Sequence, residues 1–173
     1  VNKNIKWVFL ANIHPMLQLD VLRQCSSNPK IIMDTMNLWI NTTYDELISV
    51  INCADILLIN ESELIELTGY QDLEKGARKI IDMGPENIVV KCGSKGSISY
   101  SNDSVISVNV VPNCKVVDPT GAGDTFGAGL ISGLVEGLDI FNSMVRGTVM
   151  ASFCIEDFGI EAMLNLKEDE YLK

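Results

Sequence analysis

The sequence contains little of what several common kinds of site require. It has a single histidine, His14, which argues against a histidine metal site and against a Ser-His-Asp triad. Its five cysteines are scattered and never spaced as Cys-x-x-Cys, so they indicate neither a disulfide framework nor a zinc site. They are Cys25, Cys53, Cys92, Cys114 and Cys154. Reduced cysteines of this kind are typical of a cytoplasmic protein, and we expect that location.

Basic residues and long apolar runs are also scarce. There are 13 Lys and Arg against 23 Asp and Glu, so the formal net charge is -10. This balance argues against nonspecific binding to nucleic acid or to an anionic membrane. No apolar run reaches the roughly 18 residues of a membrane helix, and no signal-peptide pattern opens the chain. With 47% hydrophobic residues, the sequence predicts one buried core and a single domain over residues 1–173.

Two familiar phosphate-binding loops are missing. The chain has no Gly-x4-Gly-Lys-Ser/Thr sequence, and no Gly-x-Gly-x-x-Gly follows its first apolar run. The sequence therefore supports neither a P-loop enzyme nor a standard dinucleotide-binding domain.

The apolar segments that are present alternate with segments of helical pattern. Four continuous apolar runs predict buried strands at residues 6–10, 30–34, 55–59 and 88–91. Helices are predicted between them at residues 15–24, 45–51, 60–69 and 73–83. This order is typical of βαβ units, so we expect an α/β fold with a mainly parallel sheet covered on both faces.

The second half of the chain adds further elements. Partial alternation predicts antiparallel edge strands at 97–100 and 105–111, and a short strand is expected at Val116-Val117. Apolar helices are predicted at 125–135 and 141–155. In the first of these, glycines at 127, 129 and 133 indicate close packing against a bare backbone. The acidic end, Lys167 to Lys173, is expected to be a solvated helix or frayed.

The segment most suggestive of chemistry is the turn after Val117. Gly121 and Gly123 allow a close approach to main-chain N–H groups, and the start of a helix leaves such groups unpaired and positively polarised. Gly121-Ala122-Gly123 is therefore a candidate anion cradle, and Asp124 places a carboxylate beside it. The alternative is that Asp124 only caps a helix after a glycine turn.

Three other polar clusters follow predicted strands, namely Asp34 to Asn37, Asn60 with Glu63, and Lys91 to Gly96. Ligands of open α/β sheets bind beyond the carboxyl ends of the strands, so we expect these clusters and the glycine turn to form one site. Structural alternatives remain for each. Asn60-x-x-Glu63 is also a helix-capping pattern, the glycines at 93 and 96 also suit a hairpin, and Lys91 also suits a strand end that reaches solvent.

The string Asp118-Pro-Thr-Gly-Ala-Gly-Asp-Thr-Phe126 closely resembles the signature of the ribokinase-like (PfkB) sugar and nucleoside kinases. The resemblance implies a three-layer α/β/α ribokinase-like fold and transfer of a phosphoryl group from ATP to a sugar or nucleoside hydroxyl. It implies that Asp124 is the base that deprotonates the acceptor hydroxyl. Gly121, Ala122 and Gly123 would then form the anion hole for the moving phosphoryl group.

The same resemblance assigns further residues. Asn60 and Glu63 match an element that organises Mg²⁺ and phosphate, with Glu63 acting through water. The nucleotide-contacting residues would be Asn60, Glu63, Lys91, Gly93, Ser94, Gly96 and Gly123. Asp118 falls where some members bind a monovalent cation, so K⁺ activation is a further expectation. ATP, Mg²⁺ and a small sugar or nucleoside are thus the implied partners.

The chain also departs from the family. Ribokinase-like kinases are considerably longer, and this sequence resembles only their later part, without the earlier region that supplies a Gly-Gly substrate motif and a β lid. We therefore expect a nucleotide-side catalytic portion, with a noncatalytic nucleotide-binding or regulatory fragment as the alternative. An exposed sheet edge would favour self-association into a homo-oligomer. Asp34-Thr35-Met36-Asn37 stands where many members have Asp-x-Asn.

Overall fold

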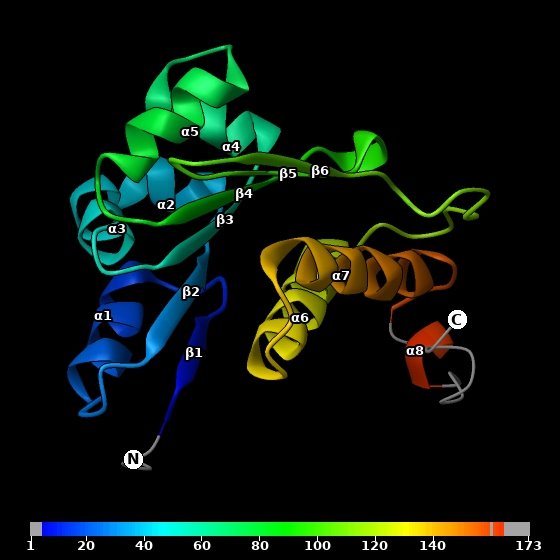
Figure 1. Cartoon of the computed structure of the whole chain (residues 1–173), viewed down its shortest axis with the longest axis horizontal. Helices are drawn as coiled ribbons and strands as arrows, with labels where there is room; N and C mark the ends of the chain where they lie inside the picture. Colours follow the sequence, from blue (N-terminus) through cyan, green and yellow to red (C-terminus); the bar gives the residue numbers. More distant parts are fainter. Residues whose placement is uncertain (1–4, 160, 165–173) are drawn as a thin grey trace. The chain divides into compact units, whose positions relative to one another are not determined.

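The computed structural model describes residues 5–159 and 161–164 (Figure 1). The strands are β1 (Trp7–Leu10), β2 (Lys30–Asp34), β3 (Ile56–Asn60), β4 (Asn87–Lys91), β5 (Ser97–Tyr100) and β6 (Val105–Val108). The helices of the first half are α1 (Pro15–Arg23), α2 (Asn37–Thr42), α3 (Tyr44–Ile51), α4 (Glu61–Thr68) and α5 (Leu73–Ile81). They are followed by a 3₁₀ turn, η1 (Gly93–Lys95), and by α6 (Ala122–Val135), α7 (Ile140–Ile155) and α8 (Glu161–Leu164).

The strands form one sheet in the order β1-β2-β3-β4-β5-β6. Strands β1 to β4 pair in parallel, with Leu10 opposite Met33 and Asn60 opposite Lys91. The links from β4 to β5 and from β5 to β6 are too short for a crossover, so these neighbours run antiparallel. A hydrogen bond from Ser101 N to Ser104 O, 2.9 Å long, closes the second turn. The expected α/β fold with a mainly parallel sheet is confirmed.

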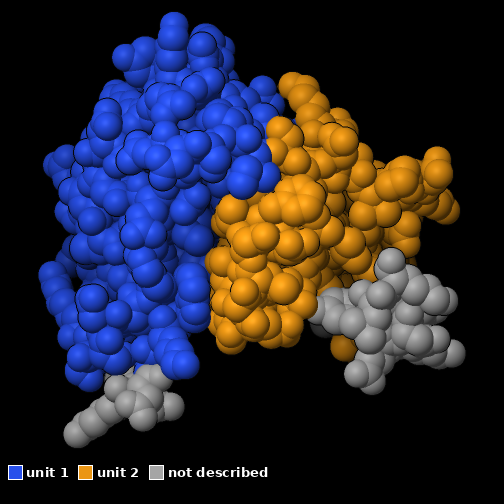
Figure 2. All heavy atoms as spheres, in the orientation of Figure 1, with its two compact units in different colours: residues 1–93, 98–106 blue, residues 94–97, 107–173 orange. Residues whose placement is uncertain are grey.

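The chain forms two compact units, coloured separately in Figure 2. Unit 1 comprises residues 1–93 and 98–106, and unit 2 comprises residues 94–97 and 107–173. That the chain acts as a single domain remains a prediction. Within residues 5–159 and 161–164, none of the helices has the length and apolar character needed to cross a membrane.

The core of unit 1 explains the continuous apolar runs of the sequence. Met33 of β2, Leu57 of β3 and Val90 of β4 point to the same face of the sheet. They pack in one buried cluster with side chains of α3, α4 and α5. Neighbouring positions that point to the opposite face, such as Ile32 and Leu58, are also fully buried. Strands buried on both faces need apolar residues at every position, and this removes the alternation seen in half-exposed strands.

Unit 2 is built on the packing of α6 against α7. A Cβ on Gly129 would lie 2.7 Å from Gly147 Cα and 3.0 Å from Arg146 O, and a Cβ on Gly133 would lie 2.8 Å from Ser143 Oγ. The two helices are therefore so close that only hydrogen atoms fit between their backbones at Gly129. The close packing predicted from the glycines of α6 is confirmed at these two positions.

Three local predictions need correction. The strand expected at Val116-Val117 does not form: Val116 is 63% exposed, and the N–H of Val117 donates to Ile155 O of α7 at 2.7 Å. Two β-branched residues favour a strand only if a neighbouring strand offers its backbone groups, and here a helix end takes that place. Helix α2 was not expected, because its first residue was assigned to a polar cluster. Helix α6 begins at Ala122, three residues before the predicted start at 125. The acidic end at Lys167 to Lys173 lies outside the described residues.

We predict that Gly129→Ala lowers the free energy of unfolding by about 2 kcal/mol, because the added methyl group must push α6 away from the backbone of α7. Urea unfolding followed by circular dichroism measures the change. Ala128→Gln at an exposed position of the same helix is the control, with an expected effect within about 0.5 kcal/mol. If the glycine had no packing role, Ala would instead stabilise the helix by up to about 1 kcal/mol.

Candidate functional site

Polar side chains gather at the carboxyl ends of β2, β3 and β4 in unit 1. Residues opposite each other in parallel strands point to the same face, and so do residues two apart in one strand. Asp34 lies opposite Leu58, and Asn60 lies two residues later, opposite Lys91. Asp34, Asn60 and Lys91 therefore extend from one face of the sheet. It is the face opposite the one on which α3, α4 and α5 pack.

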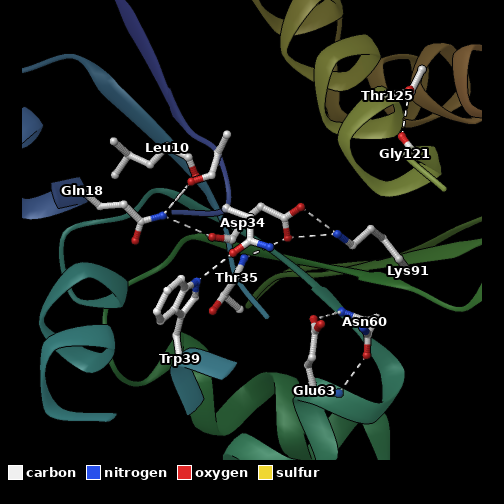
Figure 3. Close-up of polar contacts among 12 residues, drawn as sticks. Leu10, Gln18, Asp34, Thr35, Trp39, Asn60, Glu63, Lys91, Gly121 and Thr125 are labelled. Atoms are coloured by element: carbon white, nitrogen blue, oxygen red, sulfur yellow. Dashed lines mark hydrogen bonds and ion pairs between the residues drawn. The ribbon is translucent and has the colours of Figure 1, made fainter. Parts of the chain in front are cut away.

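Asp34 and Lys91 form an ion pair at this edge (Figure 3). Lys91 Nζ donates to both carboxylate oxygens of Asp34 at 2.9 Å. The side chains are only 5% and 19% exposed for Asp34 and Lys91. The pair joins β2 to β4 across β3, a distance of about 10 Å between strand axes that only a long side chain can span. The lysine predicted to contact the nucleotide thus neutralises a buried carboxylate of the chain itself.

Two more side chains hold the backbone where β1 and β2 end, and neither was predicted from the sequence. Gln18 of α1 is 1% exposed, and its Nε2 donates to Leu10 O at 3.4 Å, Ala11 O at 3.0 Å and Asp34 O at 3.3 Å. Trp39 Nε1 donates to Asn12 Oδ1 at 2.8 Å. A glutamine on the buried side of α1 is the only hint in the sequence, since a buried amide needs partners.

Asn60 and Glu63 form the capping box of α4 (Figure 3). Glu63 N donates to Asn60 Oδ1 at 2.8 Å, and Asn60 N donates to Glu63 Oε2 at 3.0 Å. Glu63 is 5% exposed, and its burial raises the pKa of the carboxyl group, while the charge of Lys91 opposes this shift. Asn60 and Glu63 therefore form the helix cap that was the structural alternative for this motif. The capping bond uses Oε2, which leaves Oε1 as the oxygen for any second role.

Residues of this group line a shallow, open depression of about 440 Å³ in unit 1. Asn60, Ser62 and Lys91 are on its wall together with Gly93. The turn that follows β4 contains two more of the predicted residues: Ser94 is exposed in η1, and Gly96 is buried. A Cβ on Gly96, at a φ of +90°, would collide with Val108 O, so this glycine is required by the hairpin itself.

The glycine turn lies in unit 2 and starts α6. Gly121 has φ +81° and ψ -3°, a left-handed conformation that favours glycine. Its carbonyl oxygen accepts hydrogen bonds from Thr125 N at 2.9 Å and from Thr125 Oγ1 at 2.8 Å (Figure 3). Within the part of the chain that the structure describes, the N–H groups of Gly121, Gly123 and Asp124 donate no hydrogen bond to protein atoms.

This helix start differs from those of the other long helices. Among the described helices of nine or more residues, α1, α5 and α7 begin with a side chain that accepts a hydrogen bond from the first turn. The side chains are those of His14, Asp72 and Asp139. Helix α6 begins at Gly121 and has no such cap. The shorter helices α2 and α3 also begin without a side-chain cap. Among the described helices of nine or more residues, α6 is the one whose first turn offers its N–H groups to an acceptor other than a capping side chain.

Two carboxylates flank this turn. Asp124 is the third residue of α6 and is exposed, and among the described residues its carboxylate has no hydrogen bond or ion pair. The alternative in which Asp124 is the N-cap does not apply, because Gly121 holds that position. Asp118 Oδ1 accepts a hydrogen bond from Thr120 N at 3.0 Å, and this bond lowers the pKa of Asp118.

The predicted residues thus form two groups. Unit 1 brings together Asp34, Asn60, Glu63, Lys91 and Gly93, and unit 2 contains Asp118, Asp124 and the glycine turn. That both groups act in one site remains a prediction. Between residues 5 and 164, position 160 aside, the structure has no cluster of three or more His, Cys, Asp or Glu arranged to hold a metal ion.

Known proteins are similar to this chain in sequence and in fold. Residues 18–166 match the family described as pfkB family carbohydrate kinase. A nucleoside kinase of Methanocaldococcus jannaschii is 29% identical over 166 residues, which are 94% of this chain and 53% of that protein. The chain therefore spans about half the length of this relative.

Two solved structures show the same fold with bound nucleotide. Arabidopsis thaliana ribokinase, complexed with ribose and ATP, matches with a TM-score of 0.76 and 29% identity over 88% of this chain and 50% of that one. A putative ribokinase II from E. coli, in complex with ATP and Mg²⁺, matches with a TM-score of 0.70 and 26% identity over 78% of this chain and 44% of that one. The expected ribokinase-like fold is confirmed.

We predict that Lys91→Met lowers the free energy of unfolding by about 3 kcal/mol, because it leaves the buried Asp34 carboxylate without its counter-charge. Asp34→Asn in the same chain should recover part of the loss, since it removes the orphaned charge. Arg78→Met is the matched control: the Arg78–Glu74 pair is about half exposed, and its loss should cost less than about 1 kcal/mol. Equal effects of the two methionine variants in urea unfolding would contradict a stabilising role of the buried pair.

We further predict a pH-dependent effect of Glu63→Gln. Burial raises the pKa of Glu63 in the folded protein above its value in the unfolded chain. The stabilisation by the protonated carboxyl is therefore fully present below the unfolded-state pKa and is lost as pH rises through the folded-state pKa. Gln keeps the capping box and cannot ionise. The stability of the variant relative to wild type should therefore increase as pH rises above about 4.5, measured by urea unfolding in EDTA. A difference that is constant with pH would show that the buried carboxyl does not titrate differently on folding.

Proposed function

Because the chain belongs to the pfkB family of carbohydrate kinases, we propose that it is the nucleotide-side part of a kinase that transfers a phosphoryl group from ATP to a hydroxyl of a sugar or nucleoside. The chain spans 53% of the nucleoside kinase that it resembles, so the activity is proposed for the protein to which this part belongs. The observation that carries the proposal is the uncapped start of α6 next to the exposed carboxylate of Asp124.

The uncapped turn suits the charge that develops during phosphoryl transfer. The transferred group passes through a loose transition state with charge on its peripheral oxygens, so catalysis depends on position and charge stabilisation. The N–H groups of Gly121, Gly123 and Asp124 lack partners among the described residues, and the dipole of α6 adds to their field. Fixed donors of this kind contribute about 3 kcal/mol each in comparable sites.

Asp124 is the group that we assign to the acceptor hydroxyl. A general base must be free to accept a proton, and the carboxylate of Asp124 is exposed and without partner among the described residues. In the proposed reaction the hydroxyl donates a hydrogen bond to Asp124, its oxygen attacks the γ-phosphorus, and the proton passes to the carboxylate as the bond to ADP breaks. A phosphorylated sugar or nucleoside and ADP are the products.

The other polar group is assigned to the nucleotide and its metal ion. Mg²⁺, when bound, would neutralise charge between the phosphates, and it usually keeps several waters and few protein ligands. Glu63 Oε1 is free of the capping bond and fits a water-mediated contact, as Asn60 and the turn at Gly93 fit the nucleotide. Asp118, whose pKa is lowered by Thr120 N–H, is the carboxylate suited to a monovalent cation such as K⁺.

The test is turnover with ATP and Mg²⁺ in the presence of pentoses, hexoses and nucleosides, measured as ADP release. We predict that Asp124→Asn lowers kcat by a factor of about 10² to 10⁴ and changes the Kd for ATP by less than about twofold, because a base acts only on the acceptor. Asp45→Asn, an exposed carboxylate in the first turn of α3, is the control and should leave both values unchanged.

Two results would contradict the proposal. Unchanged kcat in Asp124→Asn would remove Asp124 from its role as base. ATP binding without turnover, in a chain that extends over the full length of its relatives, would favour the noncatalytic nucleotide-binding module.

A further inference from the structure

We propose that Cys154 is a positioning residue that orients the N–H group of Gly121 toward the phosphoryl group. The role that we assign to Cys154 rests on the proposed function, whereas the contacts of its thiol lie entirely within unit 2. Cys154 is near the end of α7 and is 2% exposed. The thiol has no part in the chemistry proposed above.

The thiol of Cys154 lies against the glycine turn. Cys154 Sγ is 3.5 Å from Thr120 O, to which the S–H group donates, and 4.0 Å from Gly159 O. The sulfur would also be 3.6 Å from a Cβ built on Gly121, which is ordinary van der Waals contact. One buried side chain thus touches the peptide between Thr120 and Gly121 through both a hydrogen bond and packing.

Because the peptide bond is planar, this contact determines the direction of the Gly121 N–H group. In a planar trans peptide the C=O and the following N–H point in opposite directions. The thiol holds the carbonyl of Thr120 on the side of α7, so the N–H of Gly121 points to the opposite side. This N–H is one of the groups without a partner among the described residues. The direction of a proposed anion-hole donor is therefore set by a sulfur atom on another helix.

The next peptide is held separately. The carbonyl of Gly121 accepts from both Thr125 N and Thr125 Oγ1, so rotation about the Gly121 backbone is restricted on its C-terminal side. On its N-terminal side, the turn hydrogen bond from Ala122 N to Pro119 O at 3.2 Å is compatible with two orientations of the Thr120–Gly121 peptide, those of type I and type II turns, because glycine allows both signs of φ. A second restraint is needed to select one of them. Cys154 supplies that second restraint, and the two together fix a left-handed glycine in one orientation.

The experiment compares four variants of the chain by ¹⁵N relaxation of the Gly121 amide and by steady-state kinetics. Cys154→Ala removes the thiol, Cys154→Val removes the donor while filling slightly more than its volume, and Cys154→Ser keeps a donor. Cys114→Ala is the matched control, because that thiol donates to Ser152 O of the same helix at 3.4 Å and has no recorded contact with the turn.

In wild type, Cys154→Ser and Cys114→Ala we expect an order parameter of about 0.85 for the Gly121 amide, and in Cys154→Ala and Cys154→Val a value below about 0.6. The kcat for phosphoryl transfer should fall about tenfold in the Ala and Val variants of Cys154, with less than a twofold change in the KM for ATP. Serine should restore most of the rate.

An ordered Gly121 amide in both Cys154→Ala and Cys154→Val would overturn the inference, and order retained in Cys154→Val alone would show that volume and not the S–H donor is responsible. A similar drop of the Gly121 order parameter in Cys114→Ala would contradict a specific role of Cys154, because it would show that any change in the packing of α7 loosens the turn. If no variant and no wild-type chain turns over ATP, the proposed function fails for this chain, while the amide order parameter still decides the role of Cys154.

Discussion

The structure depends on how backbone hydrogen-bonding groups are satisfied where helices and strands end. Each helix leaves N–H groups unpaired in its first turn, and in α1, α4, α5 and α7 a side chain accepts from one of them. Helix α4 uses Asn60 and Glu63, and α7 uses Asp139. Helix α6 has only Gly121 at this position, so no side chain caps its first turn. These N–H groups are the donors that we propose to face a ligand.

The charged side chains at the carboxyl ends of β2 and β4 must also have partners. A carboxylate at the end of a buried strand loses its hydration, so Asp34 is stable only with a partner, and Lys91 reaches it across β3. Glu63, three residues after the end of β3, accepts a hydrogen bond from the backbone N–H of Asn60 instead, and burial raises its pKa. The groups proposed to receive a nucleotide are therefore already fixed in place by contacts within the chain.

The sequence predicted elements whose signal is local and missed contacts that depend on distant backbone groups. The strands β1 to β4 were found within two residues, because fully buried strands are continuous apolar runs. The predicted strand at Val116-Val117 was wrong, since the N–H of Val117 donates to Ile155 O at the end of α7. Gln18 and Cys154 could not be assigned roles, because each acts on carbonyl groups that only the fold brings to it. The motif at Asn60 and Glu63 is the converse case, since its local pattern predicted the cap that the structure contains.

The charge of the chain explains why a backbone site suits this protein. A triphosphate would meet a formal net charge of -10. Lys91, at the start of the predicted nucleotide turn, is already paired with Asp34 and therefore adds little attraction for phosphate, whereas Lys95 of the same turn is exposed. Helix N–H groups attract an anion through fixed partial charges, need no counter-ion, and keep their direction when the rest of the surface is acidic. A metal ion that travels with the nucleotide would supply the remaining positive charge. In the proposed reaction, the orientation of the turn at Gly121 therefore matters more than Lys91 for holding the phosphoryl group.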